Sequence, residues 1–154
     1  MGRLDFAPVY LRLGDRAEDI LTAQLQASSN FRGIRSAFPA DLNETFLTGF
    51  SLLEKYNLAY DNWSPDFTRL PRLADLANKN PGVTVIVNHL GGKIDPSADE
   101  EELSVWREAI DSVAACSNTV MKLGGAQMRV GDWEPPYHMP VSYTHLTLPT
   151  RTRV

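Results

Sequence analysis

Five side chains that could take part in chemistry follow short apolar segments of this sequence. They are Arg35, Asp61, Trp63, His89 and Lys122. An imidazole changes its charge near neutral pH, so His89 could act as a general base or polarise a carbonyl group. The planar guanidinium of Arg35 could hold a carboxylate through two hydrogen bonds, which a lysine cannot do. We therefore take His89 as the catalytic candidate and the other four as substrate-binding candidates.

Each of these residues also has a purely structural interpretation. His89 could cap a strand with a hydrogen bond, and Arg35 could pair with a carboxylate such as Asp61. Lys122 could extend its ammonium group into solvent, and Trp63 could be a packing residue. The sequence alone leaves both kinds of interpretation open.

The stretch around His89 indicates which element would position it. Residues 83–87 are a run of five β-branched side chains, which predicts a strand buried on both faces, as in a parallel sheet. His89 appears where the run ends, and Gly91 and Gly92 free the backbone to turn sharply. Because α/β folds place their chemistry at the carboxyl ends of parallel strands, His89 stands at an expected functional position.

Strand and helix patterns alternate along the whole chain. We expect strands at residues 5–11, 31–36, 58–63, 83–87 and 119–125. Apolar residues at helical spacing predict four helices between these strands. The first two helices have expected caps at Asp15 and Asn43, the third follows Ser64 and Pro65, and the fourth opens at residues 97–100. The expected inner faces are, in order, Ala17, Ile20, Leu21 and Leu25; Phe46, Leu47, Phe50 and Leu53; Leu70, Leu73, Ala74 and Ala77; and Leu103, Trp106, Ile110 and Val113.

This alternation predicts an α/β fold with a parallel sheet and right-handed crossovers. No G-x-G-x-x-G follows the first strand and there is no Walker loop, so the nucleotide-binding folds lose their main support. A barrel remains, and a complete (β/α)8 TIM barrel takes about 250 residues. With 154 residues and about five strand units, the chain is predicted to be a partial TIM barrel in a single domain.

The composition excludes several classes of function. The net charge is -4 and the pI is near 5.3, without a cluster of Lys and Arg, which argues against nucleic-acid binding. No apolar run approaches the roughly 20 residues of a membrane span, and the N-terminus lacks a signal-peptide core. Cys116 is the only cysteine, which fits a reducing cytoplasm. We expect a cytoplasmic protein with a small-molecule substrate, and the sequence leaves its oligomeric state open.

Five segments together resemble the amidohydrolase-2 family. They are residues 31–35 (FRGIR), 58–61 (LAYD), 87–92 (VNHLGG), 106–107 (WR) and 121–125 (MKLGG). This is a family of TIM-barrel hydrolases that includes lactonases and zinc-dependent decarboxylases. The resemblance covers about residues 5–138 and implies that the chain corresponds to about strands 3 to 7 of the barrel. It also implies that the five candidate side chains follow the fourth to seventh barrel strands.

The resemblance further implies a choice between two roles for His89. The corresponding histidine is a metal ligand in metal-dependent members and faces the substrate in metal-free lactonases. A catalytic zinc usually has three protein ligands, which His89 alone cannot provide. The family's first-strand His-x-His and final-strand acidic residue are absent, no histidine ends the fifth-strand equivalent, and His138 follows two prolines in a loop.

These departures favour a lactonase-like, metal-free parent that hydrolyses a lactone or cyclic ester of a small carboxylated or sugar-derived molecule. One alternative is a zinc-dependent decarboxylase or amide hydrolase of the same family, with a divalent metal such as zinc in the full-length parent and His89 as a ligand. Another is a non-catalytic α/β binding module. We expect no cofactor and no activity in the chain as given, because a barrel lacking three strands leaves two sheet edges open.

The end of the chain does not continue the strand–helix pattern. Residues 141–154 have no helical period and resemble a translated read-through of a sequencing adapter. We exclude them from the interpretation and give His145 no role. The alternative is a natural β-rich tail that packs on an exposed edge. The predicted domain is therefore residues 1–140.

Overall fold

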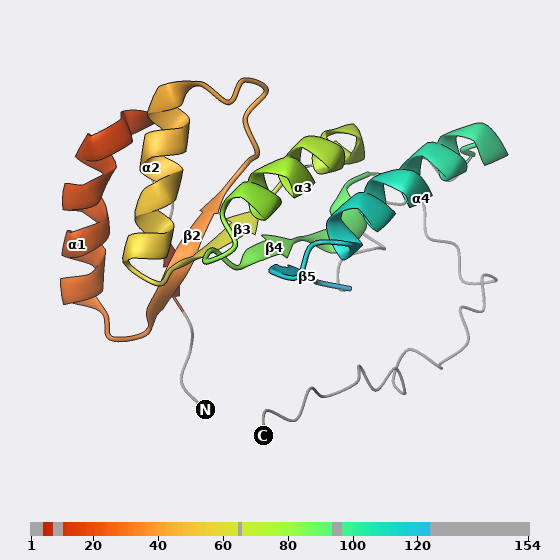
Figure 1. Ribbon diagram of the computed structural model, residues 1–154. Coiled ribbons are helices and arrows are strands. Elements are labelled where there is room, and N and C mark those ends of the chain that lie inside the picture. Colours follow the sequence, from red (N-terminus) through yellow and green to blue (C-terminus); the bar gives the residue numbers. More distant parts are fainter. Residues whose placement is uncertain (1–4, 8–10, 65, 94–96, 124–154) are drawn as a thin grey trace.

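A five-stranded parallel sheet is the centre of the computed structural model, which describes residues 5–7, 11–64, 66–93 and 97–123 (Figure 1). The order of strands in the sheet is their order in the sequence, and every neighbouring pair is parallel. The strands are β1 (Asp5–Ala7), β2 (Phe31–Ser36), β3 (Ala59–Asn62), β4 (Val85–Val87) and β5 (Thr119–Met121). The predicted α/β architecture is confirmed.

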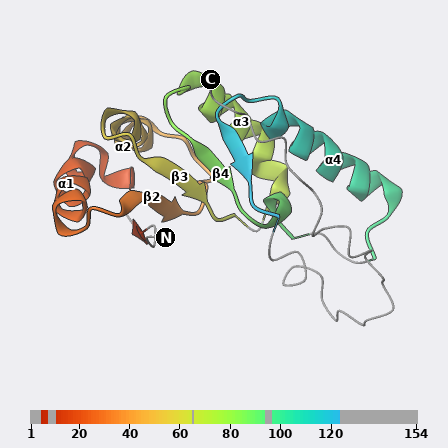
Figure 2. The same cartoon turned by 90° about the horizontal axis from the view of Figure 1, so that it is seen from below.

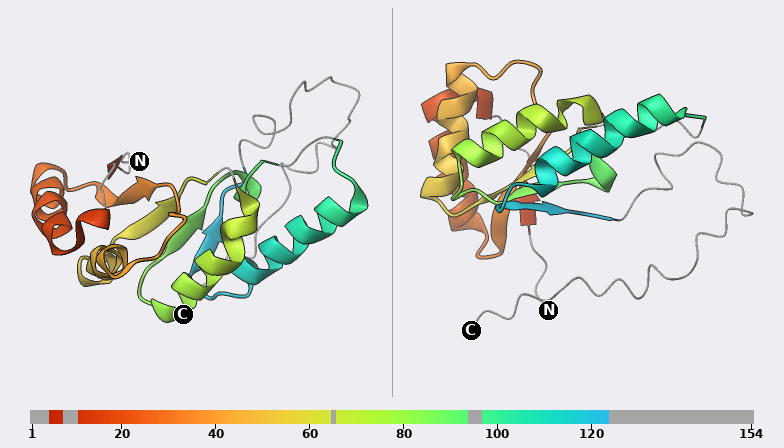
Figure 3. Two further views of the ribbon diagram at one scale, coloured as in Figure 1. Left: turned by 90° about the horizontal axis from the view of Figure 1, so that it is seen from above. Right: turned by 45° about the vertical axis from the view of Figure 1, so that its right-hand side comes forward.

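Helices connect these strands and lie against one face of the twisted sheet (Figure 2, Figure 3). Those in the described part of the chain are α1 (Ala17–Ala27), α2 (Glu44–Lys55), α3 (Leu70–Lys79) and α4 (Glu100–Ala114), with the short 3-10 helices η1 (Leu11–Arg16), η2 (Phe67–Arg69) and η3 (His89–Gly91). Each α-helix follows one strand and leads to the next, parallel strand. This is the repeating unit of a barrel wall.

The hydrophobic core lies between the sheet and the helices. Tyr60 of β3 and Val87 of β4 are almost completely buried, and the Tyr60 ring packs edge-on against Phe50 of α2 with ring centres 5.3 Å apart. Successive side chains of a strand point to opposite faces. Asp61 and its register partner Ile86 therefore lie on the face of the sheet that points away from the helices.

The prediction that residues 83–87 are buried on both faces is wrong. The three valines of this run are buried, but Thr84 is exposed and Ile86 is only half-buried. The reason is that, among the described residues, helices cover one face of the sheet only. A continuous apolar run therefore behaves here as an alternating strand.

The predicted starts of α1 and α2 have different outcomes. Asn43 caps α2 as expected, and its side-chain oxygen accepts a hydrogen bond of 2.9 Å from the Phe46 N–H. Asp15 does not cap α1. The 3-10 helix η1 continues through Arg16, and α1 begins at Ala17 without a side-chain cap.

The inner face of α2 also differs from the prediction. Leu47, which helical spacing placed on the buried side, is 42% exposed. The buried residues of this helix are Phe46, Gly49, Phe50, Leu52 and Leu53. Helix α2 packs against η1 as well as the sheet, and Gly49 lies so close to η1 that an added Cβ would clash with the backbone carbonyl of Leu11. Phe46, Phe50 and Leu53 are thus buried as predicted, and Leu47 is the one predicted inner residue of α2 that is exposed.

Some predictions concern the ends of elements or lie beyond them. The first strand ends at Ala7, and Leu11 already begins η1. The last strand ends at Met121, and residues 124–125 and the predicted tail at 141–154 lie outside the described residues, as does His138. Within the described ranges, no helix combines the length and apolar character needed to span a membrane.

Candidate functional site

Asp61 is a completely buried carboxylate near the carboxyl end of β3. It lies on the face of the sheet that the helices do not cover, where a complete barrel would have its interior. Buried carboxylates require hydrogen-bonded or charged partners, because removing the charge from water is otherwise very costly. The partners of Asp61 therefore define the site.

Two cationic side chains from different strands hold the same oxygen of Asp61. Arg35, its register partner on β2, donates to Oδ2 from Nε at 3.0 Å and from a terminal nitrogen at 2.7 Å. Lys122, directly after β5, donates to Oδ2 from Nζ at 2.9 Å. The Arg35 and Lys122 side chains are 48% and 41% exposed. Both side chains are thus anchored at Asp61 and still have almost half of their surface exposed.

The amide of Asn88 holds the other carboxylate oxygen. Its nitrogen donates to Asp61 Oδ1 and to the backbone carbonyl of Asn62 at 2.8 Å. Asn88 is buried, and the prediction missed it because His89 beside it carries the more reactive group. Alternation could have found it, since Asn88 lies two positions after Ile86 and so on the same face as Asp61.

The cluster of Arg35, Asp61, Asn88 and Lys122, which we call the Asp61 cluster, has a net positive charge. Burial raises the pKa of Asp61, but hydrogen bonds from Lys122, Arg35 and Asn88 together outweigh this effect and hold the pKa below its ordinary value. One carboxylate and two cations leave a net charge of one positive unit. The site is therefore suited to an anionic group, and Asp61 itself is a poor base.

The remaining predicted site residues lie next to this cluster along the chain. Trp63 follows β3 and is 49% exposed, and its backbone N–H donates to the Ser36 carbonyl at 3.0 Å. His89 follows Asn88 directly, is half-buried and begins η3. Its φ of 49° is left-handed, which is uncommon for a residue other than glycine. The strand order thus brings all five predicted residues to one end of the sheet.

The sequence profile of the amidohydrolase family matches residues 13–147. The chain belongs to the amidohydrolase family. It is 30% identical to the uncharacterized protein y4mH of Sinorhizobium fredii over 75% of this chain and 41% of that protein. The predicted family is therefore confirmed.

Two solved structures of an amidohydrolase from Burkholderia multivorans share the fold. One contains bound zinc and the other bound HEPES, and both superimpose with a TM-score of 0.65. The sequence identities are 20% and 22%, and the matches cover 78% and 79% of this chain. They cover 43% and 44% of the Burkholderia chains, so this amidohydrolase chain spans less than half the length of the relatives it matches. The five strands correspond to part of a TIM barrel.

The described residues of this amidohydrolase do not compose a zinc site. Within residues 5–7, 11–64, 66–93 and 97–123, no three His, Cys, Asp or Glu side chains are grouped so that they could hold a metal ion. Asp61, the carboxylate among the predicted site residues, already binds two cationic side chains. A cation placed there would compete with Arg35 and Lys122, so we assign no step to a metal.

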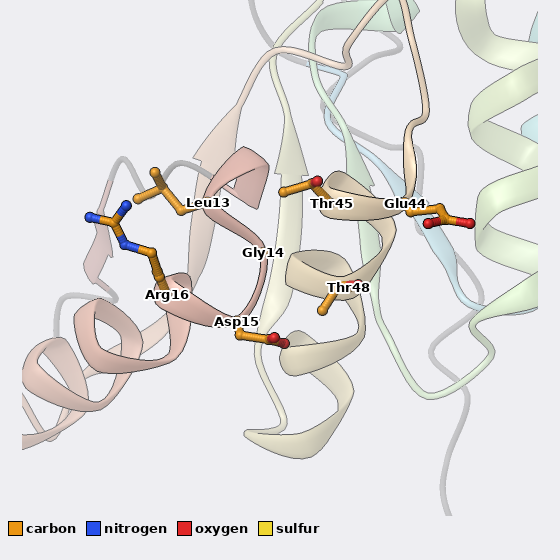
Figure 4. A pocket seen from close by; sticks show the side chains of 7 residues that line it. All are labelled: Leu13, Gly14, Asp15, Arg16, Glu44, Thr45 and Thr48. Atoms are coloured by element: carbon orange, nitrogen blue, oxygen red, sulfur yellow. The ribbon is translucent and has the colours of Figure 1, made fainter.

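A separate shallow pocket lies between η1 and the start of α2 (Figure 4). Its volume is about 400 Å³, and it contains none of the five predicted site residues. Its lining residues are Leu13, Gly14, Asp15, Arg16, Glu44, Thr45 and Thr48. The charged and hydroxyl side chains among them are all exposed, so the pocket lacks the buried polar groups typical of a binding site.

Proposed function

We propose that this amidohydrolase chain contributes the substrate-binding rim of a hydrolase that opens a lactone or related cyclic ester. The substrate class is a small molecule with a carboxylate or a sugar-derived ring. The observation that carries the proposal is the Asp61 cluster, in which Arg35 and Lys122 are tied to a buried carboxylate yet remain about half exposed. Such fixed donors can stabilise negative charge on a substrate or on a developing oxyanion.

Each residue of the rim has a separate role in the proposed reaction. Arg35 binds the substrate's carboxylate, and Lys122 stabilises the charge that develops on the carbonyl oxygen. Asp61 holds both cations and, because its pKa is lowered, does not take the proton itself. His89, whose imidazole is the usual general base of enzymes, accepts the proton in this proposal. Trp63 offers an exposed aromatic face to the substrate ring.

In the proposed reaction, the oxygen of a water molecule bonds to the ring carbonyl carbon while His89 accepts a proton from that water. The carbon–oxygen bond of the ring then breaks. The departing alkoxide takes the proton back from the imidazolium, which leaves a hydroxy acid and restores the neutral histidine. Placement of water, base and cations at one rim lowers the barrier because the groups need no rearrangement during the reaction.

A lactonase assay on the longest reading frame that contains this sequence tests the proposal. We expect His89→Ala to lower kcat by about 10²- to 10⁴-fold, as for loss of a general base. Arg35→Lys should raise KM about tenfold for a carboxylated lactone, because the two-pronged contact with the substrate is lost, and should change KM for a neutral lactone little, because a lysine keeps the positive charge beside Asp61. Arg107→Gln, which removes an exposed ion pair with Glu100, is the control. Full activity of His89→Ala would remove histidine from the mechanism.

A metal-dependent decarboxylase or amide hydrolase of the same family is the second candidate. It is favoured by the zinc bound in one Burkholderia multivorans structure. The two candidates differ in their response to a chelator. Dialysis of the complete enzyme against a chelator should leave lactone hydrolysis intact, whereas activity that disappears and returns with added zinc would support the second candidate.

A further inference from the structure

The turn that carries His89 is held in an unusual backbone conformation. His89, Leu90, Gly91 and Gly92 all have positive φ values, of 49°, 56°, 83° and 154°. Glycine adopts such values readily, but histidine and leucine adopt them only when the surrounding structure compensates for the strain. The contacts that compensate therefore determine where the imidazole lies.

One part of this support comes from inside the sheet. The Asn88 side chain is tied to Asp61 and to the Asn62 carbonyl, and the Asn88 carbonyl accepts from the Gly91 N–H at 3.0 Å. These bonds fix the residue just before His89. The last of them also holds the N–H of the peptide between Leu90 and Gly91, but none of these three bonds holds the carbonyl of that peptide.

The other part comes from α4, on the outside. The indole Nε1–H of Trp106 donates to the Leu90 carbonyl at 3.1 Å. Gly91 packs against α3 and α4 so closely that an added Cβ would lie 2.5 Å from Leu70 Cδ1 and 3.1 Å from Ile110 Cδ1. Trp106 is partly buried against the core, so its ring is not free to move away. The indole therefore holds the carbonyl end of the Leu90–Gly91 peptide, whose N–H is already bound to the Asn88 carbonyl.

We infer that Trp106 is a positioning residue, which acts through the Leu90 carbonyl to hold the strained turn and so sets the place of the His89 imidazole relative to the Asp61 cluster. The inference rests on the proposed function only in that the chemistry of His89 is what the turn serves. Trp106 does not touch the substrate. Its action is transmitted along two peptide units from α4 to the rim.

Nuclear magnetic resonance on the 154-residue chain tests this inference at one fixed pH. Trp106→Phe keeps an aromatic ring on α4 and removes the N–H donor together with part of the indole's packing surface. We expect the His89 ring-proton shifts to change and the exchange of the Gly91 and Gly92 amide protons to accelerate about tenfold or more, because the turn opens more often. Arg107→Gln, the next residue on the same helix, should change neither signal. Unchanged His89 shifts and glycine exchange in folded Trp106→Phe would overturn the inference.

Two further measurements separate positioning from simple packing. Asparagine tolerates the left-handed conformation better than leucine, so Leu90→Asn should make the turn less dependent on Trp106. The effect of Trp106→Phe on glycine exchange should then be smaller in the Leu90→Asn background, and an equal effect would contradict the inference. In the unaltered chain, the Trp106 indole proton should exchange more slowly than that of half-exposed Trp63. This comparison decides the matter even where Trp106→Phe fails to fold, since a fast-exchanging Trp106 indole would refute the hydrogen bond.

None of these chemical-shift and hydrogen-exchange measurements depends on catalytic activity. Full lactonase activity in His89→Ala would overturn the proposed function and leave the role of Trp106 in the turn standing. Unchanged His89 shifts and glycine exchange in Trp106→Phe would overturn this inference and leave the proposed function standing.

Discussion

Asp61 is the residue on which the geometry of the rim depends. Its Oδ2 atom accepts hydrogen bonds from both Arg35 and Lys122, and its Oδ1 atom accepts one from Asn88. Removing one member of a fully buried ion pair costs about 3–5 kcal/mol. Here the two cations are about half exposed and can regain water, so the smaller cost of a lost buried hydrogen-bond acceptor, about 1–3 kcal/mol, is the better guide.

The first prediction concerns Asp61→Asn. The pKa of Asp61 is lowered in the folded chain, so as the pH falls the unfolded chain binds the proton first. The stability that the carboxylate contributes is complete above the unfolded pKa of about 3.9 and is lost as the pH falls through the lower, folded pKa. We expect Asp61→Asn to lower the free energy of unfolding by about 1–3 kcal/mol at pH 7, and the difference from wild type to shrink as the pH falls below about 4.

Thermal melting of both chains across this pH range measures the effect. Asp75→Asn, an exposed position on α3, controls for the loss of one negative charge and should follow the wild-type curve. A constant gap between Asp61→Asn and wild type down to about pH 3 would contradict the prediction.

Sequence reasoning reached part of this site. The pairing of Arg35 with Asp61 was one of two alternatives, because both residues end neighbouring parallel strands. The contact of Lys122 with Asp61 was not predicted, since it spans the width of β4 and depends on the twist of the sheet. Asn88 was missed because an amide carries no obvious chemistry, although its role follows from the need of a buried carboxylate for donors.

Among the larger elements, the contact between α2 and η1 depends on one glycine. Gly49→Ala would place a methyl group against the Leu11 backbone, which cannot move without shifting η1. We expect a loss of about 1–3 kcal/mol in the free energy of unfolding, as for other overpacked sites. Gly82→Ala is the matched control. An added Cβ there would meet only the flexible carboxylate end of Glu54, so denaturant unfolding should change by less than about 0.5 kcal/mol.

Equal stability of Gly49→Ala and Gly82→Ala would mean that η1 is free to move away from α2. The close approach would then not be a fixed feature of the fold. A large loss in Gly82→Ala alone would place the constraint in the turn before β4 instead.

The side chain of Asn118, directly before β5, links β5 to the end of α3 and to the connection between α3 and β4. The amide nitrogen of Asn118 lies 2.8–3.0 Å from the carbonyl oxygens of Ala77, Asn80 and Val83. We expect Asn118→Ala to cost about 1–3 kcal/mol, because buried acceptors lose their donor. Asn118→Asp, which keeps the shape but replaces the donor with a carboxylate facing carbonyl oxygens, should cost more. Denaturant titration measures both, and a neutral Asn118→Asp would refute this role.

At the element scale, the order of strands and helices was predictable because each follows a distinct apolar period. Their packing partners were not. Leu47 fits the helical period of α2 but is exposed, and Gly49, which that pattern did not select, is buried against η1. Asp15 has the residue type of a helix cap, yet η1 occupies the position where α1 would begin. Tertiary contacts decided both cases.

For the molecule as a whole, the main feature is that one face of the sheet is covered and the other is not. Val87 of β4 lies on the covered face and is 1% exposed, whereas Val120 of β5 lies on the uncovered face and is 52% exposed. We expect Val87→Ala to lower the free energy of unfolding by roughly 2–3 kcal/mol, through lost burial and a cavity. Val120→Ala should change it by less than about 0.5 kcal/mol.

The same substitution at two sites of one sheet makes this comparison internally controlled, and denaturant unfolding of the two variants is sufficient. A loss at Val120 similar to that at Val87 would show that something covers the open face in solution. The sequence did not predict this asymmetry, because residues 83–87 are β-branched on both faces and such a run also occurs in strands that are covered on both sides.

The shared tether of Arg35 and Lys122 has a consequence for the rate and affinity of binding. Long cationic side chains normally lose rotational freedom when they grip an anion, at about 0.5–1.5 kcal/mol for each side chain immobilised. Asp61 restricts both side chains when the chain folds, before any ligand binds. In the function that we propose, an incoming anionic substrate therefore meets donors that are already aligned, and its capture is governed by long-range attraction that weakens as ionic strength rises.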